Sequence, residues 1–260
     1  MSVFANKVLE GHVALVTGGG TGICRGIARE LAAHGAAVCI TSRKQEVLDE
    51  TAAQMREETG GDILAMAADV RKPDDLEAVV AKTVETFGSL DTLVNGAAGN
   101  FLAPAVNLSS NTYKTVIEID LQGTFNASKA AFEHLKASKQ GLILNISATL
   151  QLHGTPMQVH ACSAKAGIDA QTRCLAVEWG PHIRVVGIAP GPIGDTEGFR
   201  RLAPGDLGKK MQQKIPMRRF GAIKEVADLA VFLRTGAANY INGTTIVIDG
   251  GESVAIEFGL

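Results

Sequence analysis

The sequence predicts an α/β fold, a doubly wound parallel sheet of seven strands with helices on both faces. Short apolar runs alternate with amphipathic stretches along the whole chain, which is typical of strands joined through helices. The apolar runs are hydrophobic on both faces, as expected for strands that are covered on two sides. With 260 residues, 46% of them apolar, the chain can bury one core, so we expect a single domain over residues 1–260.

The strands are expected at the short apolar runs. In chain order these are His12–Thr17, Ala37–Thr41, Ile63–Ala67, Thr92–Asn95, Leu142–Ile146, Arg184–Ile188 and Thr245–Ile248. The amphipathic stretches between them predict helices. In chain order these are Gly22–His34, Gln45–Thr59, Pro73–Phe87, Ser110–Ser138, Met157–Trp179 and Lys224–Thr235.

One segment breaks this alternation. Pro190 to Gly221 contains four prolines and six glycines, too many helix breakers for one long helix. The segment leaves the carboxyl end of the sixth strand, where doubly wound sheets bind their ligands. We therefore expect a substrate-covering lid at residues 191–221, and the alternative is a plain surface excursion.

Composition and charge exclude several classes of protein. The net charge is −2 and Lys and Arg are scattered, so no basic face predicts nucleic acid or an anionic membrane as a partner. No apolar run approaches the roughly 20 residues of a membrane span, and the first residues lack the pattern of a signal peptide. The cysteines show no metal-ligand spacing. We expect a soluble intracellular protein with reduced thiols, without a metal and without membrane insertion.

A glycine-rich turn joins the first strand to the first helix. Its backbone N–H groups and the helix N-terminus are suited to a dinucleotide pyrophosphate, and a tight turn without a ligand is the alternative. Cys24 stands where a third glycine is usual, and a small buried filler explains it better than a redox thiol. The residues expected to hold the pyrophosphate are Gly18, Gly19, Gly20, Thr21, Gly22 and Ile23.

The end of the second strand indicates which dinucleotide binds. An NAD enzyme would need a carboxylate there for the ribose 2′-hydroxyl, and none is present. Ser42 and Arg43 instead offer donors to a 2′-phosphate, with the charge of Lys44 nearby. NADPH is the expected cofactor, and a solvated basic turn is the alternative.

Two further strand ends should lie on the same edge of the sheet. Asp69 and Val70 close the third strand, and the Asp69 carboxylate can accept from the adenine amino group. Asn95 and Ala97 follow the fourth strand, where small residues leave room for the adenosine. Each residue type is common at strand ends, so it is their joint placement that predicts a nucleotide site.

Together these features resemble the short-chain dehydrogenase/reductase family over essentially the whole chain. The matching segments are the glycine turn, Asn95-Gly96-Ala97-Ala98, Ser147, Lys165, Pro190-Gly191 and Asp249-Gly250-Gly251. The resemblance implies a Rossmann fold, a nicotinamide cofactor and a homotetramer, for which the two long helices, Ser110–Ser138 and Met157–Trp179, are the expected interface. It also assigns Pro190, Gly191, Ile193 and Lys165 to the cofactor.

The main departure from that family is a missing tyrosine. Ala161 stands four residues before Lys165, where such enzymes have the tyrosine that protonates the alkoxide formed from a ketone. Alanine has no proton to give. Either the protein is not a catalyst, or it reduces a substrate whose developing charge spreads over a conjugated system.

A narrower resemblance explains this departure. Four motifs are similar to the NADPH-dependent 2,4-dienoyl-CoA reductases, above all the peroxisomal branch. They are Ala97-Ala98-Gly99-Asn100-Phe101-Leu102, Ser147-Ala148-Thr149-Leu150, Gln158-Val159-His160-Ala161-x-Ser163-Ala164-Lys165 and Pro190-Gly191-Pro192-Ile193-x-x-Thr196-Glu197-Gly198. The resemblance implies an acyl-CoA thioester as substrate. It also suggests a peroxisomal location, although the last residues, Phe258-Gly259-Leu260, are not a Ser-Lys-Leu type of signal.

By the same resemblance, Asp120 and Lys165 are the expected catalytic residues and move a proton through water. A salt bridge in the helix interior without a catalytic role is the alternative. The resemblance also places Phe101 along the acyl chain, Ser109 and Asn111 near CoA, and Arg71 and Arg201 at its phosphates. Helix capping by Ser109 and Asn111, and solvated arginines, are the alternatives.

Two rival functions remain open on these residues. A carbonyl reductase acting on a 3-ketoacyl thioester or a sugar would need an acid from elsewhere, and neither Tyr113 nor Tyr240 has the right spacing. A non-catalytic NADPH-binding protein would explain the lost tyrosine equally well. Substrate turnover separates the three hypotheses.

Overall fold

The computed structural model describes residues 4–5, 7–196, 198–199 and 206–255 of the chain. Seven parallel strands form one sheet in the order β3-β2-β1-β4-β5-β6-β7, with the crossovers that define a doubly wound sheet. The predicted fold class is confirmed. The strands are β1 (Val13–Thr17), β2 (Ala37–Ser42), β3 (Ile63–Ala67), β4 (Thr92–Asn95), β5 (Gly141–Ile146), β6 (Ile183–Pro190) and β7 (Thr245–Ile248).

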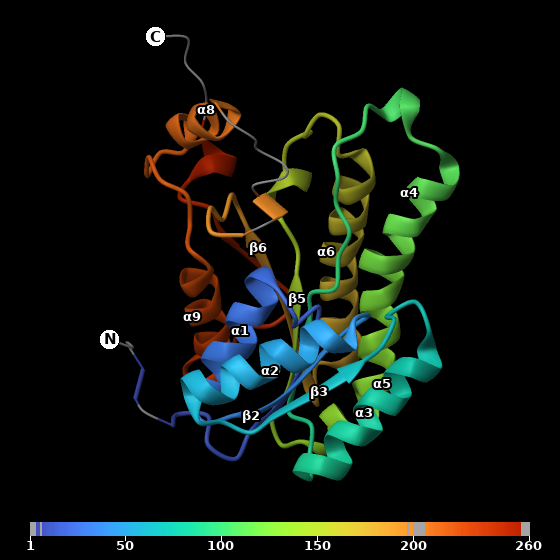
Figure 1. Cartoon of the computed structure of the whole chain (residues 1–260), viewed down its shortest axis with the longest axis vertical. Coiled ribbons are helices and arrows are strands. Elements are labelled where there is room, and N and C mark those ends of the chain that lie inside the picture. Colours follow the sequence, from blue (N-terminus) through green and yellow to red (C-terminus); the bar gives the residue numbers. More distant parts are fainter. Residues whose placement is uncertain (1–3, 6, 197, 200–205, 256–260) are drawn as a thin grey trace.

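Helices cover both faces of this sheet (Figure 1). One face carries α1 (Gly22–Ala33), α2 (Gln45–Thr59) and α9 (Ile223–Arg234), and the apolar cluster beneath them includes Ile27, Leu48 and Val231. The opposite face carries α3 (Pro73–Phe87), α5 (Gly123–Ala137) and α6 (Val159–Trp179), over a second cluster that includes Leu76, Leu93 and Leu135. The central strands are therefore buried on both faces, as the unbroken apolar runs predicted, whereas the edge strands β3 and β7 are only partly covered.

The helix predicted at Ser110–Ser138 is not one regular α-helix. α4 (Ser110–Ile117) continues into a π-helical turn, η2 (Glu118–Gln122), which in turn continues into α5. The prediction is wrong at this turn, because i→i+5 hydrogen bonds replace the regular i→i+4 pattern there. The turn carries Asp120, whose side chain is buried. Such turns inside α-helices are frequent at functional sites.

The helix predicted from Met157 begins two residues later, at Val159. Met157 has a φ of 66°, in the left-handed region that L residues avoid, so it cannot be part of the helix. Its carbonyl accepts a hydrogen bond from Ala103 N at 2.9 Å, which ties the start of α6 to the loop after β4. Such a backbone conformation costs roughly 1–3 kcal/mol, and it persists only where the surrounding structure holds the residue in place.

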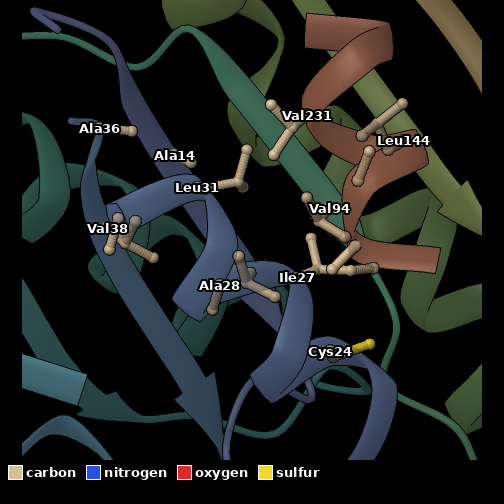
Figure 2. Close-up of a cluster of buried hydrophobic side chains, with 14 of the residues drawn as sticks. Ala14, Cys24, Ile27, Ala28, Leu31, Ala36, Val38, Val94, Leu144 and Val231 are labelled. Atoms are coloured by element: carbon tan, nitrogen blue, oxygen red, sulfur yellow. The ribbon is translucent and has the colours of Figure 1, made fainter. Parts of the chain in front are cut away.

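The core beneath α1 explains why this helix packs closely on the sheet and on α9 (Figure 2). Ile27, Ala28 and Leu31 point from α1 into the cluster, and all three are at most 1% exposed. Cys24 belongs to the same cluster, and burial raises the pKa of its thiol to about 11. The thiol is therefore uncharged at neutral pH, and its role as a small buried filler is confirmed.

Replacement of Gly26 by valine is expected to destabilise the fold. A Cβ atom at position 26 would lie 2.0 Å from Ile223 Cγ2 of α9, too close unless the Ile223 side chain or one of the helices moves. Overpacking of this kind destabilises a fold by about 1–3 kcal/mol. That exceeds the stabilisation of at most roughly 1 kcal/mol expected from the higher helix propensity of the new residue. The midpoint of urea denaturation should fall. Adding Ile223→Ala should restore much of the loss, and an unchanged midpoint in Gly26→Val would contradict the contact.

None of the helices in the described residues has the length and apolar character that crossing a membrane requires. In the parallel sheet, β1 to β6 all end at the same edge, and the turns and loops that follow them gather there. That edge is where the predicted nucleotide-binding residues meet.

Candidate functional site

A cleft of about 1100 Å³ opens at the carboxyl edge of the sheet. Its walls are the glycine turn after β1, residues 42–44 after β2, residues 68–70 after β3, residues 96–98 after β4, residues 147–150 after β5 and residues 190–193 after β6. Many of the predicted site residues line it. They are Gly18, Gly20, Thr21, Gly22, Ile23, Ser42, Arg43, Asp69, Val70, Ala97, Lys165, Pro190, Gly191 and Ile193.

Two glycines of the first turn are required by its geometry. Gly18 has a φ of 70°, and a Cβ there would lie 2.8 Å from the carbonyl oxygen of Gly96. Gly22 has a φ of 58° and open space where a Cβ would stand. Gly22 also begins α1, so the amino end of that helix faces the cleft. A concave turn of bare backbone at a helix N-terminus fits a phosphate group.

The basic end of the cleft holds Ser42, Arg43 and Lys44. Asp69 lies there too, and its carboxylate accepts hydrogen bonds from the backbone and side chain of Arg71 at 2.5–3.1 Å. The bond from Arg71 is the main reason why the pKa of Asp69 falls to about 2. Arg71 itself lines a smaller hollow beside the cleft, with Lys72, Glu118 and Gln122. Asp69 and Arg71 therefore bond to each other in the structure, whereas the sequence predicted contacts of Asp69 with adenine and of Arg71 with a CoA phosphate.

Asp120 and Lys165 form a buried ion pair at the opposite wall. Lys165 Nζ lies 3.5 Å from Asp120 Oδ2, and it donates to the carbonyl of Ile146 at 2.9 Å. Asp120 Oδ1 accepts from the backbone N–H of Gly99 at 2.7 Å. The side chains of Lys165 and Asp120 are 10% and 1% exposed, and Lys165 reaches the cleft while Asp120 lies behind it. The contact expected from the sequence is present.

Burial raises the pKa of the Asp120 carboxyl, although Lys165 and the Gly99 N–H favour its charged form. Desolvation therefore outweighs the attraction of the neighbouring cation. A carboxyl with a raised pKa beside an ammonium group, in the wall of a cleft, is suited to holding or passing a proton.

Residue 161 brings no hydroxyl to this wall. Ala161 is 1% exposed, four residues before Lys165 in α6. Among the described residues the cleft lining contains neither Tyr113 nor Tyr240, and Tyr240 is fully exposed. Nearby, the hydroxyl of Ser147 is buried, lines the cleft and has no hydrogen-bond partner in the described part of the chain. An unpaired buried hydroxyl in a cleft is able to donate a hydrogen bond to a ligand or to a water molecule.

The remaining predicted residues lie away from the lining. Asn95 belongs to a buried network, in which it donates to Ser128 at 3.0 Å and to Asn145 at 2.9 Å. Ser109 caps α4 by accepting from the N–H of Thr112 at 3.1 Å, which supports the alternative of a helix cap. Gly19, Phe101 and Asn111 also stand outside the lining. Arg201 lies outside the described residues.

Sequence reasoning missed Thr149 and Glu252 as cleft residues. Thr149 Oγ1 lies 3.5 Å from the carbonyl oxygen of Pro190 and 3.4 Å from Glu252 Oε2. Burial raises the pKa of Glu252, which lines the cleft. Their positions in the sequence would have pointed to the cleft, because both follow strands that end at its edge. Thr149 follows β5, and Glu252 follows the Asp249-Gly250-Gly251 turn after β7.

The segment after β6 covers one side of the cleft. Its two ends are joined, since Gly194 N donates to Gly221 O at 3.1 Å and Gly221 N donates to Pro192 O at 3.0 Å. Between them α8 (Asp206–Lys214) lies beyond the carboxyl end of β6, at the top of Figure 1. Phe199 packs on Phe220 with ring centroids 4.6 Å apart, and Thr196, Phe199 and Met211 reach the cleft.

Among the described residues, His, Cys, Asp and Glu side chains do not gather into groups that could hold a metal ion. Residues 18–253 match the sequence profile of a family described as enoyl-(acyl carrier protein) reductase. The chain is 46% identical over 251 residues to the peroxisomal 2,4-dienoyl-CoA reductase of Danio rerio. The aligned region covers 96% of this chain and 84% of that protein.

Solved structures agree with this family. The chain is 41% identical to a short chain dehydrogenase from Bacillus anthracis, with a TM-score of 0.84 over 93% of this chain and 96% of that one. It is 28% identical to a gluconate 5-dehydrogenase from Burkholderia cenocepacia, which was solved with NADP and tartrate, with a TM-score of 0.89 over 95% of this chain and 97% of that one. The family resemblance expected from the sequence is confirmed.

Proposed function

Because the chain belongs to the short-chain dehydrogenase/reductase family, we propose that it is an NADPH-dependent 2,4-dienoyl-CoA reductase. The product would be a 3-enoyl-CoA, formed in the β-oxidation of unsaturated fatty acids. One observation carries the proposal: the Asp120–Lys165 ion pair stands in the cleft wall, and residue 161 brings no hydroxyl there. The identity of 46% to a relative of that activity supports the same substrate class.

The residues of the cleft fit a nicotinamide dinucleotide. The glycine turn gives bare backbone for the pyrophosphate, and the unpaired Ser147 hydroxyl and Lys165 lie at the opposite wall for the nicotinamide end. Ser42 and Arg43 are placed for a 2′-phosphate at the basic end. When bound, NADPH supplies a hydride to the far carbon of the conjugated thioester.

Arg43→Ala is expected to raise the KM for NADPH about 10- to 100-fold. The change would remove a charge-assisted hydrogen bond to the 2′-phosphate, worth about 1.5–3 kcal/mol. NADH lacks that phosphate, so its KM should not change, and NADH titrations serve as the control. Equal losses with both cofactors would remove Arg43 from the phosphate site.

The missing tyrosine is consistent with this reaction. Hydride addition to a dienoyl thioester leaves a negative charge that spreads onto the thioester oxygen, and the proton later goes to carbon. No alkoxide forms, so a phenol is not needed. Asp120 and Lys165 would orient a water molecule between them and the substrate, and the raised pKa of Asp120 suits it to passing the proton.

The test is a comparison of three thioesters at equal concentration. NADPH consumption should be seen with trans,trans-hexadienoyl-CoA and not with crotonyl-CoA or acetoacetyl-CoA. Consumption with acetoacetyl-CoA would favour a carbonyl reductase. Cofactor binding without turnover of any of the three would favour the non-catalytic alternative.

Three further features belong to the same proposal. Residues 191–221 would act as the substrate-covering lid of a single domain, since their described part reaches the cleft. The protein would be a homotetramer whose interface is formed by the helices at Ser110–Ser138 and Met157–Trp179. A peroxisomal location is supported by the name of the Danio rerio relative.

A further inference from the structure

His160 is a buried histidine that the proposed reaction does not yet use. It is the second residue of α6, directly before Ala161, and its exposed fraction is 0%. Neither ring nitrogen forms a hydrogen bond within the described part of the chain. Burial lowers its pKa, although the Phe101 backbone and Asp120 favour the charged ring, so the imidazole is neutral at pH 7.

The ring of His160 supports the loop after β4. It stacks on the ring of Phe101 with a centroid distance of 4.3 Å and an interplanar angle of 21°. The neighbouring residue Asn100 donates to Gln158 Oε1 at 2.6 Å, so this loop lies along the start of α6. Asn100 and Leu102 flank Phe101 and both line the cleft. The position of the His160 ring therefore determines where this wall of the cleft stands.

The same loop reaches the ion pair. The Gly99 N–H bonds to Asp120, and His160 lies close enough for each of the two side chains to favour the charged form of the other. The groups that face Asp120 are Lys165 and His160 from α6 and the Gly99 N–H from the loop. The groups that face His160 are Asp120 and the backbone at Phe101.

We propose that His160 is a positioning residue for dienoyl reduction. Its ring fixes Phe101 and thereby the wall against which the acyl chain lies, and the same loop holds the Gly99 N–H against the Asp120 carboxyl for the proton step. This inference rests on the proposed function. It assigns the positioning role to the ring face, which another aromatic ring at position 160 should be able to fill.

Two variants separate the ring face from the ring nitrogens. His160→Phe keeps the stack, so the KM and kcat for hexadienoyl-CoA should stay within about twofold of wild type. His160→Gln keeps a polar donor and removes the ring, so its KM should rise about tenfold. The loop would then hold the Gly99 N–H less firmly, so kcat should fall and the acid limb of the kcat profile should move to higher pH.

A matched control changes a packed ring on the same helix. Trp179 packs on Phe132 with ring centroids 4.8 Å apart and lies about 28 Å along α6 from His160. Trp179→Phe should leave KM, kcat and the pH profile unchanged. Thermal melting and NADPH fluorescence titration check that each variant folds and binds cofactor. If His160→Phe does not fold, His160→Gln carries the test through its KM.

The outcomes distinguish this inference from the proposed function. A His160→Phe enzyme that loses as much activity as His160→Gln would show that the stack does not position the loop. A His160→Gln enzyme with wild-type KM would defeat the role of the stack. A wild-type enzyme that does not reduce hexadienoyl-CoA would instead overturn the proposed function, and this inference with it.

Discussion

Lys165→Ala is expected to lower kcat for hexadienoyl-CoA about 1000-fold or more. The change removes the ammonium group 3.5 Å from Asp120, together with its bond to the Ile146 carbonyl. Acid–base groups of this kind contribute about 10²- to 10⁴-fold to a rate. The Asp120 carboxyl would also lose the cation that favours its charged form, so its pKa would rise further. Stopped-flow measurement of NADPH oxidation gives the rate of the chemical step.

The loss has to be separated from unfolding. Removing one partner of a buried ion pair can cost about 3–5 kcal/mol, so Lys165→Met, which keeps the aliphatic stem, is the matched variant. Both variants should keep the wild-type circular dichroism spectrum. Lys82→Ala on α3 removes only an exposed pair with Glu85 and should leave turnover unchanged. Retention of more than a tenth of the turnover in Lys165→Met would exclude Lys165 from the proton step.

Asp120→Asn is expected to lower kcat about 100-fold in a protein that still folds but is less stable, because the buried Lys165 ammonium loses its charged partner. The asparagine oxygen can still accept from the Gly99 N–H, which keeps the loop in place, but the negative charge beside Lys165 is lost. Asp228→Asn on α9 removes a carboxylate from a surface pair with Lys224 and is the control. Near-normal turnover in Asp120→Asn would leave the ion pair with a structural role only.

The pH dependence gives a second test of Asp120. Because burial raises its pKa, the carboxylate is lost at a higher pH than an ordinary aspartate, for which the pKa is about 3.9. The kcat of the wild-type enzyme should therefore fall as the pH is lowered through that raised pKa, and Asp120→Asn should lack this limb. Since Asp120 and Lys165 interact, the observed pKa belongs to the pair.

The regular parts of the fold were predictable because their signals are local. The bounds of β3, β4, β7, α2 and α3 agree with the sequence prediction residue for residue. The ends of α2 and α3 are marked by Gly60 and Gly88, both of which adopt the left-handed conformation at the helix C-cap. Short apolar runs and helix-terminating glycines carry their information within a few residues.

The site residues that lie at the ends of strands were predictable from the sequence. Residues that follow β1, β2, β3, β4 and β6 line the cleft because parallel strands end at one edge. The pair of Asp120 and Lys165 was expected from the family resemblance, but other contacts between distant segments were not predictable from a single residue pattern. The stack of Phe101 on His160 joins residues 59 positions apart, and the network of Asn95 and Asn145 joins residues 50 positions apart. The pairing of Asp69 with Arg71 is local, but its geometry depends on how the loop folds.

The π-helical turn at Glu118–Gln122 makes the chemistry depend on residue count as well as on residue type. Each α-helical residue rotates the chain by about 100°, so a helix with one residue fewer would carry Asp120 round its axis, away from Lys165. Deletion of one residue in this turn would thus abolish activity even if every functional residue were still encoded. Comparison of the spacing between positions 110 and 137 is for that reason a simple genomic criterion for which homologous genes still encode a working catalyst.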